Sequence, residues 1–540
     1  MRKIVFALLA VIVAGSVVGT QPVSASASVA APSWIEDAVI YEVNIRQYTE
    51  AGTFDAFAEH LPRLKELGVD VLWLMPVTPI SQTKRLGTLG SYYSVDNYTG
   101  INPEYGDEQD FQELIDEAHD QGFKVILDWV ANHTGWDNAW ISAHPDWYTK
   151  DSDGNIIHPA GTTWEDVADL NFTNTQMRAA MIDAMKYWVN TYDIDGFRCD
   201  YASGVPQNFW NEASLALNSI KPLFMLAEDS TNFDLMNTAF DANYSWQLKD
   251  VLNTIGTNKT GVSDLTELVA NQKNWFPTNT FPMNFITNHD ENSWSGTEFE
   301  RLGNNVDAMT AVYFTLPGVP LIYTGQEISL NRRLKFFDKD SIDWNLGTPR
   351  PLLAHLAQLK SDNPALDVGP TAGSFKNIPS GQDSVIAYVR SRDAHRLITL
   401  ANFSNRARTV KLAFGSDAGS YREVSSNVKT VLLKNTTITI PAYGFKVLTN
   451  NTLGSQVQKV TKISLTTKTL KVARNSLTTL IPQISPRHVT NATITWKSTN
   501  PKVLKVYSNG VVKALKKGVA KVWAISSNSS VKTSVTITVK

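Results

Sequence analysis

The sequence predicts a (β/α)8 barrel followed by two modules of antiparallel β-strands. Three observations lead to this fold class: eight short apolar runs before residue 370, amphipathic stretches between those runs, and a change after Pro370 to alternating apolar and polar residues. Near-continuous apolar runs are typical of strands buried on both faces of a parallel sheet, and alternation is typical of strands with one buried face. With 540 residues, of which 43% are hydrophobic and 19% charged, the chain is too apolar for a disordered protein and long enough for several domains.

The barrel is expected within residues 28–369. Its helices follow the pattern of residues 110–121, where apolar side chains recur at helical spacing and Gly122 supplies a stop. Residues 133–174, between the third and fourth strands, are rich in Trp, Asp, Pro and Gly and predict a small subdomain over the barrel mouth, because structureless loops of that length are uncommon. The expected strands are residues 39–43, 69–75, 124–129, 194–199, 223–227, 239–242, 283–287 and 319–323.

The C-terminal part divides into two β modules with a linker. Residues 370–450 contain alternating segments and predict an antiparallel β domain, and residues 451–457 form a polar linker. Residues 458–540 contain short Thr, Val, Ile and Lys strands separated by turns, which predicts a small Ig-like β-sandwich. In the first module we expect strands at 385–389, 397–403, 410–414, 431–433 and 437–440.

The N-terminus has the features of an export signal. Arg2 and Lys3 precede an apolar run to about residue 18, and small residues follow, so residues 1–27 are interpreted as a signal peptide. A membrane anchor is the alternative, but the run is short for a span and no second run approaches about 18 residues. We therefore expect a secreted, extracellular protein without a membrane span after processing. The single cysteine, Cys199, excludes an intramolecular disulfide.

Acidic residues stand at the ends of four expected strands. These residues are Asp128, Asp200, Glu228 and Asp290. The carboxyl ends of barrel strands meet at one mouth, which is where catalytic groups lie in such folds. One such carboxylate has a structural explanation as a helix cap, but four clustered like charges raise each other's cost and indicate a functional site.

Several motifs, in order along residues 34–450, resemble those of the α-amylase family, glycoside hydrolase family 13. DWVANH at 128–133 resembles the first signature of that family and GFRCD at 196–200 the second. Glu228 in MLAE matches the third signature, and FITNHD at 285–290 matches the fourth. VADLN at 167–171 resembles an auxiliary signature, and GVPLIY at 318–323 is similar to the last barrel strand.

The resemblance implies roles for the carboxylates. Asp200 would be the nucleophile of a retaining glycoside hydrolase, Glu228 the general acid and base, and Asp290 a ligand of sugar hydroxyls that helps distort the ring. Arg198 would hold Asp200 ionised, because a neighbouring cation lowers a carboxyl pKa. The chemistry needs no organic cofactor, and the implied substrates are α-glucan polysaccharides and oligosaccharides.

The family resemblance also assigns residues that bind the sugar. His133 and His289 would donate hydrogen bonds to it, and Tyr92 would stack on it. Asp96, in GSYYSVD at 90–96 with Tyr92, and Asn288, in the fourth signature, are also substrate-binding candidates, and so is Arg198. Taken singly, His133 is better explained as a satisfied loop histidine and Tyr92 as core or loop packing, while Arg198 has an equal explanation as a salt-bridge partner. Cys199 is interpreted as a small buried hydrophobe.

The sequence departs from the family after the nucleophile. Many α-amylases have a Lys-His pair there, which contacts the acceptor sugar and a structural calcium, whereas YASGVP follows Asp200 here. Asn132 keeps the position of the first calcium ligand, so calcium remains possible there, but calcium takes six to eight oxygen ligands. The departure also leaves α-amylase, maltogenic, cyclomaltodextrinase and glucanotransferase activities open, together with a catalytically silent binding protein, which the presence of all three carboxylates disfavours.

Charge is divided unequally along the chain. Residues 456–540 contain 15 Lys and Arg and no Asp or Glu, although the whole chain has a net charge of −3. This module resembles a bacterial Ig-like domain of group 2. A solvated spacer, attachment to an anionic cell-wall polymer and starch binding through Trp496 or Trp523 remain open. Nucleic acid is not expected as a partner, because no pattern of Arg and stacking aromatic residues accompanies the lysines.

Overall fold

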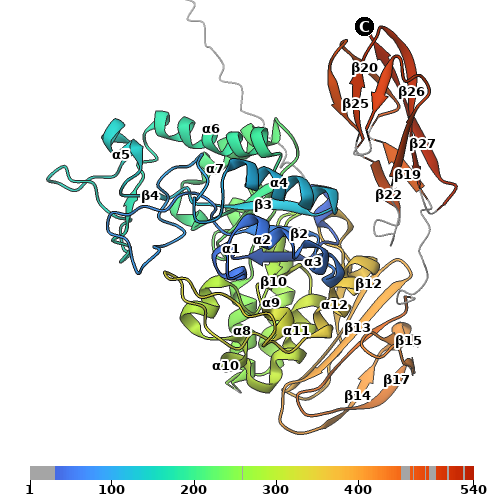
Figure 1. The fold of residues 1–540 in the computed structure, drawn as a ribbon. Coiled ribbons are helices and arrows are strands. Elements are labelled where there is room, and N and C mark those ends of the chain that lie inside the picture. Colours follow the sequence, from blue (N-terminus) through green and yellow to red (C-terminus); the bar gives the residue numbers. More distant parts are fainter. Residues whose placement is uncertain are drawn as a thin grey trace, which may run out of the picture.

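The computed structural model contains the predicted barrel, closed by eight parallel strands (Figure 1). It describes residues 31–257, 259–451, 462–465, 467–480, 482–485, 494–507, 510–526 and 529–540, so the expected signal peptide lies outside the described residues. In the order of the closed sheet the strands are β1 (Ile40–Val43), β10 (Val319–Tyr323), β9 (Phe281–Asn284), β8 (Ala242–Tyr244), β7 (Phe224–Ala227), β6 (Gly196–Cys199), β3 (Lys124–Trp129) and β2 (Val71–Leu74).

Two of the eight strand predictions are shifted along the chain. The sixth strand begins at Ala242 and not at Ala239, because Ala239 and Phe240 are buried as part of the preceding loop. The Asp241 carboxylate there accepts a hydrogen bond of 2.9 Å from the Met225 amide. The seventh strand ends at Asn284, so residues 285–287 extend beyond it toward the mouth. Apolar composition alone does not separate a buried loop from a strand at these two places.

Helices surround the barrel and pack their apolar faces on it. Helix α4 shows the local causes: Asp107 caps its first turn, Asp110 completes a capping box, and the helix buries Phe111, Leu114, Ile115 and Ala118. The barrel helices are α1 (Ile45–Tyr48), α2 (Phe54–Ala58), α3 (Leu61–Leu67), α4 (Glu108–Asp120), α6 (Thr175–Tyr192), α7 (Gln207–Asn218), α8 (Trp246–Gly256), α9 (Val262–Trp275), α10 (Glu298–Leu302), α11 (Val306–Thr315) and α12 (Pro351–Asp362). No helix in the described ranges is both long enough and apolar enough to cross a bilayer.

The segment between β3 and α6 projects from the barrel (Figure 1). It contains the short antiparallel pair β4 (His133–Gly135) and β5 (Val167–Asp169) and helix α5 (Ala139–Ala143). His133 pairs with Asp169 in this ribbon. The segment thereby carries His133 and Trp164 to the barrel mouth, where both line the same cavity.

Antiparallel strands follow the barrel, as predicted. A six-stranded sheet has the order β11-β12-β13-β18-β15-β16, and β14 pairs with β17. The sequence did not predict β11 or β15, whose polar segments SFKN and GSYRE lack a clear apolar alternation. The strands are β11 (Ser374–Asn377), β12 (Val385–Arg392), β13 (His395–Asn402), β14 (Arg408–Ala413), β15 (Gly419–Glu423), β16 (Lys429–Leu432), β17 (Asn435–Ile440) and β18 (Phe445–Thr449).

The last module also consists of strands. They form a four-stranded sheet β20-β27-β26-β23, a three-stranded sheet β21-β25-β24 and the pair β19-β22. Val522, Val535 and Ile537 lie in its buried core. The strands are β19 (Lys462–Leu465), β20 (Thr469–Val472), β21 (Leu477–Thr479), β22 (Pro482–Ser485), β23 (Ile494–Ser498), β24 (Leu504–Val506), β25 (Val511–Ala514), β26 (Gly518–Ser526) and β27 (Lys532–Val539).

Candidate active site

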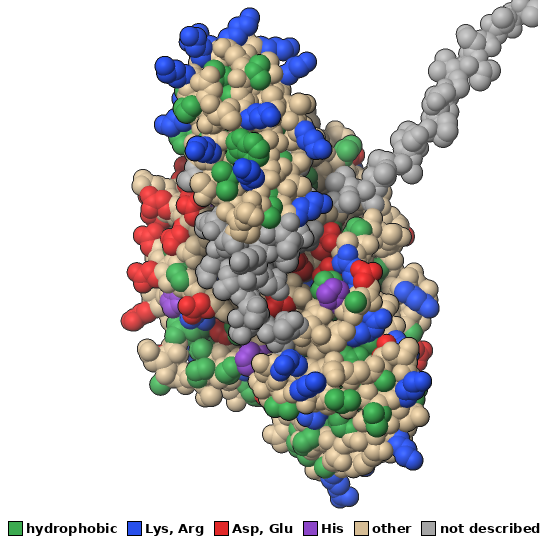
Figure 2. All heavy atoms as spheres, turned by 90° about the vertical axis from the view of Figure 1, so that its right-hand side faces the viewer, with side chains coloured by type: hydrophobic (Ala, Val, Ile, Leu, Met, Phe, Trp, Pro, Cys, Tyr) green, Lys and Arg blue, Asp and Glu red, His purple; other side chains and the backbone are tan. Residues whose placement is uncertain are grey.

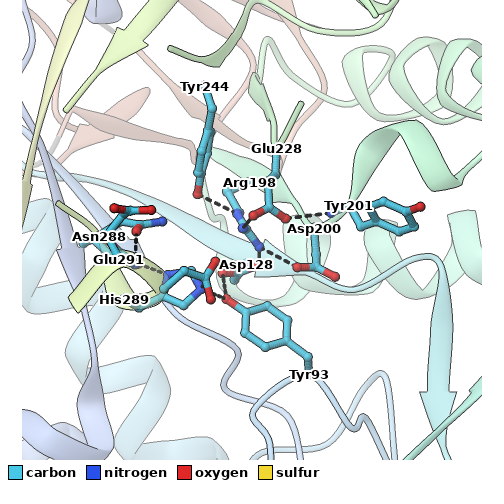
Figure 3. Close-up of polar contacts among 12 residues, drawn as sticks. Tyr93, Asp128, Arg198, Asp200, Tyr201, Glu228, Tyr244, Asn288, His289 and Glu291 are labelled. Atoms are coloured by element: carbon cyan, nitrogen blue, oxygen red, sulfur yellow. Dashed lines mark hydrogen bonds and ion pairs between the residues drawn. The ribbon is translucent and has the colours of Figure 1, made fainter. Parts of the chain in front are cut away.

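The carboxyl ends of the barrel strands open into a cavity of about 600 Å³. Asp200 directly follows β6 and Glu228 directly follows β7, so the barrel places both carboxyl groups at the same rim. Asp290 follows β9 after a short loop, and all three acids line the cavity. His133, His289 and Tyr93 line it as well. The structure therefore brings these three predicted carboxylates and the two predicted histidines to one cavity, and Figure 3 shows Asp200, Glu228 and His289 among them.

Arg198 lies at the centre of this site and is fully buried. Its Nη1 contacts Asp128 Oδ1 at 2.8 Å and Asp200 Oδ1 at 3.0 Å, and its Nη2 contacts Glu228 Oε1 at 2.9 Å. Its Nε donates to the Tyr244 hydroxyl at 2.9 Å. One guanidinium thus fixes three carboxylates (Figure 3), and the rigid fork sets their relative positions. Arg198 is not among the residues that line the cavity, and its contacts position the acids.

Asp128 supports the cluster from below the cavity floor. Its Oδ2 accepts hydrogen bonds from Trp73 Nε1 at 3.2 Å and from the Tyr93 hydroxyl at 3.1 Å. Burial raises the pKa of Asp128 to about 6, although Arg198 and His289 act to lower it. Trp73 and Tyr93 therefore stabilise the charged form of a carboxylate that the cavity itself does not solvate.

Burial raises the pKa of both Asp200 and Glu228. Burial raises the pKa of Asp200 to about 6, against the opposing effect of Arg198. Burial also raises the pKa of Glu228, to about 7, and the nearby Asp200 and Asp290 charges add to the shift while Arg198 opposes it. The Tyr201 amide donates to Glu228 Oε2 at 2.9 Å and holds that carboxyl in place. The order of the two pKa values allows an ionised Asp200 beside a protonated Glu228, which suits a nucleophile and a general acid.

His289 is held as a cation. Its Nδ1 contacts the Glu42 carboxylate, and its Nε2 lies 2.8 Å from the Tyr93 hydroxyl and 3.3 Å from Asp290 Oδ2. Burial lowers the pKa of His289, but Asp290 and Glu42 outweigh burial and raise it to about 9. Glu42 comes from β1, far away in sequence, and no motif in the sequence indicated it.

His133 is neutral. Burial lowers its pKa to about 4. The Asn132 amide nitrogen lies 3.2 Å from His133 Nδ1, so Nδ1 accepts and the proton resides on Nε2. His133 lines the cavity, and its ring is also hydrogen-bonded to the Tyr93 backbone.

The Asn132 position does not by itself make a metal site. Among the residues that the structure describes, no group of three or more His, Cys, Asp or Glu side chains is arranged to hold a metal ion. The Asp151 turn, which has a calcium-loop composition, instead closes on itself: Asp151 Oδ1 accepts from the amides of Asp153 and Asn155 at 2.9 and 2.8 Å. Calcium at Asn132 stays a prediction, and no step of the proposed reaction involves it.

Three other residues that were predicted to bind substrate also lie outside the cavity lining. Tyr92 turns away from the cavity and lies under the Arg46 guanidinium, 4.2 Å from its ring centroid, whereas the next residue, Tyr93, faces the cavity. Asp96 lies outside the cavity lining, where burial and the nearby Asp137 raise its pKa. Asn288 is buried, and its Oδ1 accepts from the Glu291 amide at 2.8 Å, which fixes the turn after Asp290.

Aromatic residues outside the family signatures flank the acids. Tyr201, directly after Asp200, packs edge to face on Trp164 with a centroid distance of 5.4 Å. A Cβ at Gly204 would come within 2.3 Å of the Tyr201 ring, so the glycine allows the ring to lie there. On the other side of the site, Trp294 is 56% exposed, and the centroid of its ring lies 5.3 Å from that of Phe336. Figure 3 shows Tyr201 on the opposite side of the carboxylates from His289 and Tyr93.

Comparison with known proteins identifies the same fold elsewhere. Residues 41–363 match the family model described as "Alpha amylase, catalytic domain". The chain is 28% identical over 454 residues to "Alpha-amylase MalA" of Haloarcula japonica, which covers 78% of this chain and 66% of that protein, and so spans just under two thirds of it. It is 24% identical over 473 residues to "Maltogenic alpha-amylase" of Bacillus acidopullulyticus, covering 77% of this chain and 78% of that protein. The crystal structure of an alpha-amylase from Lactobacillus plantarum superposes with a TM-score of 0.69 at 29% identity, covering 78% of this chain and all of that one.

Proposed function

Since the chain belongs to the α-amylase family of glycoside hydrolases, we propose that it hydrolyses α-1,4-glucosidic bonds of starch and maltooligosaccharides with retention of configuration. One observation carries the proposal: a single guanidinium, Arg198, holds the Asp200 and Glu228 carboxyls at 3.0 and 2.9 Å on the wall of one cavity. A retaining enzyme needs two carboxyl groups close together, about 5–5.5 Å apart, with one free to attack and the other free to donate a proton.

In the first step Asp200 attacks the anomeric carbon. The C–O bond to the leaving sugar breaks, and Glu228 gives its proton to the departing oxygen. The product is a glycosyl ester on Asp200 and a free shortened chain. The pKa values of about 6 and about 7 favour this pairing of an ionised nucleophile with a protonated acid.

In the second step Glu228, now ionised, accepts a proton from water, and the oxygen of that water attacks the anomeric carbon. The ester bond to Asp200 breaks, and two inversions give net retention. Arg198 stays beside both carboxyl groups and limits their movement.

The remaining polar groups hold the sugar on the glycone side. The neutral His133 donates through Nε2, while His289 supplies a positive charge beside Asp290. Tyr93, whose hydroxyl is fixed by Asp128, offers its ring to the sugar. These contacts are proposed to strengthen as the ring flattens toward the oxocarbenium-like transition state.

A second candidate is transfer to another sugar, as in a glucanotransferase, or cleavage of small dextrins, as in a cyclomaltodextrinase or neopullulanase. The observation that favours it is the aromatic pair of Trp164 and Tyr201 beside Glu228, the acid that serves the leaving group. Aromatic rings at that position bind a sugar acceptor in preference to water.

The experiment is a product time course with soluble starch, pullulan, a cyclodextrin and maltopentaose. Rapid shortening of starch with little attack on pullulan or cyclodextrin is the expected result. Products longer than maltopentaose would show that the enzyme transfers sugars to another sugar, which would contradict hydrolysis as its main reaction. Preference for cyclodextrin or pullulan would show that it acts as a cyclomaltodextrinase or neopullulanase. The Glu228→Gln protein is the matched control for contaminating activity.

Export of the enzyme is part of the proposal. Large polysaccharides do not enter cells, so an enzyme that shortens them works outside, which agrees with the leader expected at residues 1–27. The test is the distribution of enzyme between culture medium and cells with and without those residues. Retention of the full-length chain inside the cells would contradict it.

A further inference from the structure

One face of the C-terminal module combines a tryptophan with lysines. This Trp523 face is the outer side of the sheet β20-β27-β26-β23 and comprises Lys471, Lys497, Lys521, Trp523, Lys532 and Thr536. Trp523 stands directly opposite Lys497 on β23 and Ser534 on β27, and Lys521 stands opposite Thr536. Directly opposite residues of antiparallel strands share a face, so these side chains point to the same side.

The strand periodicity separates the face from the core. Along β26, Lys521 and Trp523 alternate with the buried Val522 and Ala524. Trp496, the other candidate sugar platform, points inward and packs against the core. A Cβ at Gly510 would come within 3.0 Å of the Trp496 ring, so its environment is filled. Both tryptophans are half-buried, and Trp523 is the one on the outer face of the sheet.

The charges of this face have no neutralising partner in their own module. Residues 456–540 contain no Asp or Glu, so the lysines repel one another and favour an anionic partner. In Figure 2 blue side chains surround the upper module, while red side chains belong to the rest of the molecule. The Lys532 ammonium lies 5.1 Å from the centroid of the Trp523 ring, so one cation is held next to the aromatic surface.

We propose that the Trp523 face binds a linear anionic polysaccharide. Trp523 packs on the apolar side of a pyranose ring, and Lys497, Lys521 and Lys532 pair with acidic groups on that sugar and its neighbours. Neighbouring strands are about 4.8 Å apart and alternate residues along a strand about 6.8 Å apart, so ring and cations are spaced on the scale of one sugar unit. The binding is independent of catalysis and goes beyond the proposed function: it would retain the barrel on a surface that carries such a polymer.

The test measures affinity of the full-length protein for three labelled probes in low salt. Polygalacturonate carries a carboxylate on every sugar, polyphosphate carries charge without sugar, and amylose carries sugar without charge. We expect binding to polygalacturonate to weaken about tenfold in Trp523→Ala, while polyphosphate binding stays unchanged. The double variant Lys497→Ser, Lys521→Ser is expected to weaken polygalacturonate binding by a similar factor.

The matched control removes two lysines from the other sheet. Lys505 on β24 and Lys513 on β25 pair directly across strands, so Lys505→Ser, Lys513→Ser deletes the same charge elsewhere. This control is expected to stay within about threefold of the parent. Equal losses in both double variants would show that binding depends on the overall positive charge of the module, and this result would overturn the assignment of the site to the Trp523 face. If Trp523 were needed to bind amylose and not polygalacturonate, the proposal of an anionic ligand would be overturned. Thermal unfolding would verify that each variant is folded.

Discussion

The barrel mouth and the C-terminal module both depend on charge, but they hold it in opposite ways. At the mouth, the fully buried Arg198 is surrounded by three carboxylates within 3.0 Å, and burial raises the pKa of each acid. In the module, cations gather on the surface without a single carboxylate in the same stretch of sequence. The first arrangement sets the protonation state of reacting groups, whereas the second creates a long-range attraction.

The difference follows from desolvation. A buried ion is stable only with its partners, so removal of one partner leaves an uncompensated charge and costs about 3–5 kcal/mol. An exposed lysine is solvated by water, and a single surface charge contributes at most about 1 kcal/mol. Substitutions at the mouth are therefore expected to have large effects that salt does not change, and substitutions in the module small effects that salt removes.

The largest contrast is expected from the acids themselves. Asp200→Asn or Glu228→Gln should lower kcat on maltoheptaose by roughly 10³- to 10⁴-fold, because the nucleophile or the proton donor is lost. Circular dichroism should show an intact fold. Lys505→Ser is the paired change in the module and should leave kcat unaltered; near-normal turnover of either acid variant would remove the roles assigned to the mouth.

A smaller loss is expected from Arg198→Lys. The ammonium cannot reach three carboxylates and Tyr244 with the geometry of the guanidinium, so kcat should fall about 100-fold. Since Arg198 lowers the pKa of Asp200, its replacement should also move the acidic limb of the rate profile upward. A variant with reduced kcat but an unmoved acidic limb would indicate that Arg198 is only structural.

The pH profile of the unmodified enzyme sharpens the comparison. Below a pH of about 6 Asp200 takes up a proton and ceases to be a nucleophile, and above about 7 Glu228 loses the proton that it must donate. We expect kcat/KM to rise and fall about tenfold per pH unit outside these limits. The two apparent pKa values of this profile should be unchanged in about 0.5 M NaCl, a salt concentration at which we expect the module to lose polymer binding. A shift of either pKa value with salt would contradict a buried site.

Two adjacent tyrosines provide a test within the mouth. Tyr93→Phe removes the hydrogen bonds to Asp128 and His289 and should reduce kcat/KM about tenfold. Tyr92→Phe, next to it but turned toward Arg46, should leave kcat/KM within about twofold. If the two variants behaved in the reverse order, the orientation of this loop would be wrong.

These tyrosines also show how far the sequence could lead. Strand ends are encoded locally by apolar runs that stop at Asp or Glu, so the barrel and the position of Asp200 and Glu228 at its mouth were predictable. The pair Tyr92 and Tyr93 was not, because a shift of one residue reverses which side chain faces the cavity and both residues are the same. Glu42 and Tyr244 were missed for another reason: they reach the site only through closure of the barrel, which no local pattern describes.

The smallest effect on activity is expected from substitution of Trp164, beside the proposed binding position of the acceptor sugar. Trp164→Ala exposes the Tyr201 ring and removes half of the aromatic pair, so the ratio of transfer to hydrolysis on maltopentaose should fall about threefold. Single-turnover formation of the glycosyl ester should change little, because the glycone side is untouched. An equal loss in both reactions would assign Trp164 to general packing of the subdomain.

The central claim is that Asp200 forms a covalent bond with the sugar while Glu228 moves the proton. The most direct measurement is mass spectrometry of the protein after reaction with a 5-fluoro-α-glucosyl fluoride, whose fluorine slows breakdown of the ester. The account predicts one added glycosyl group on the peptide that contains Asp200, and none in Asp200→Asn. A label on another residue, or turnover to a product of inverted configuration without any label, would contradict it.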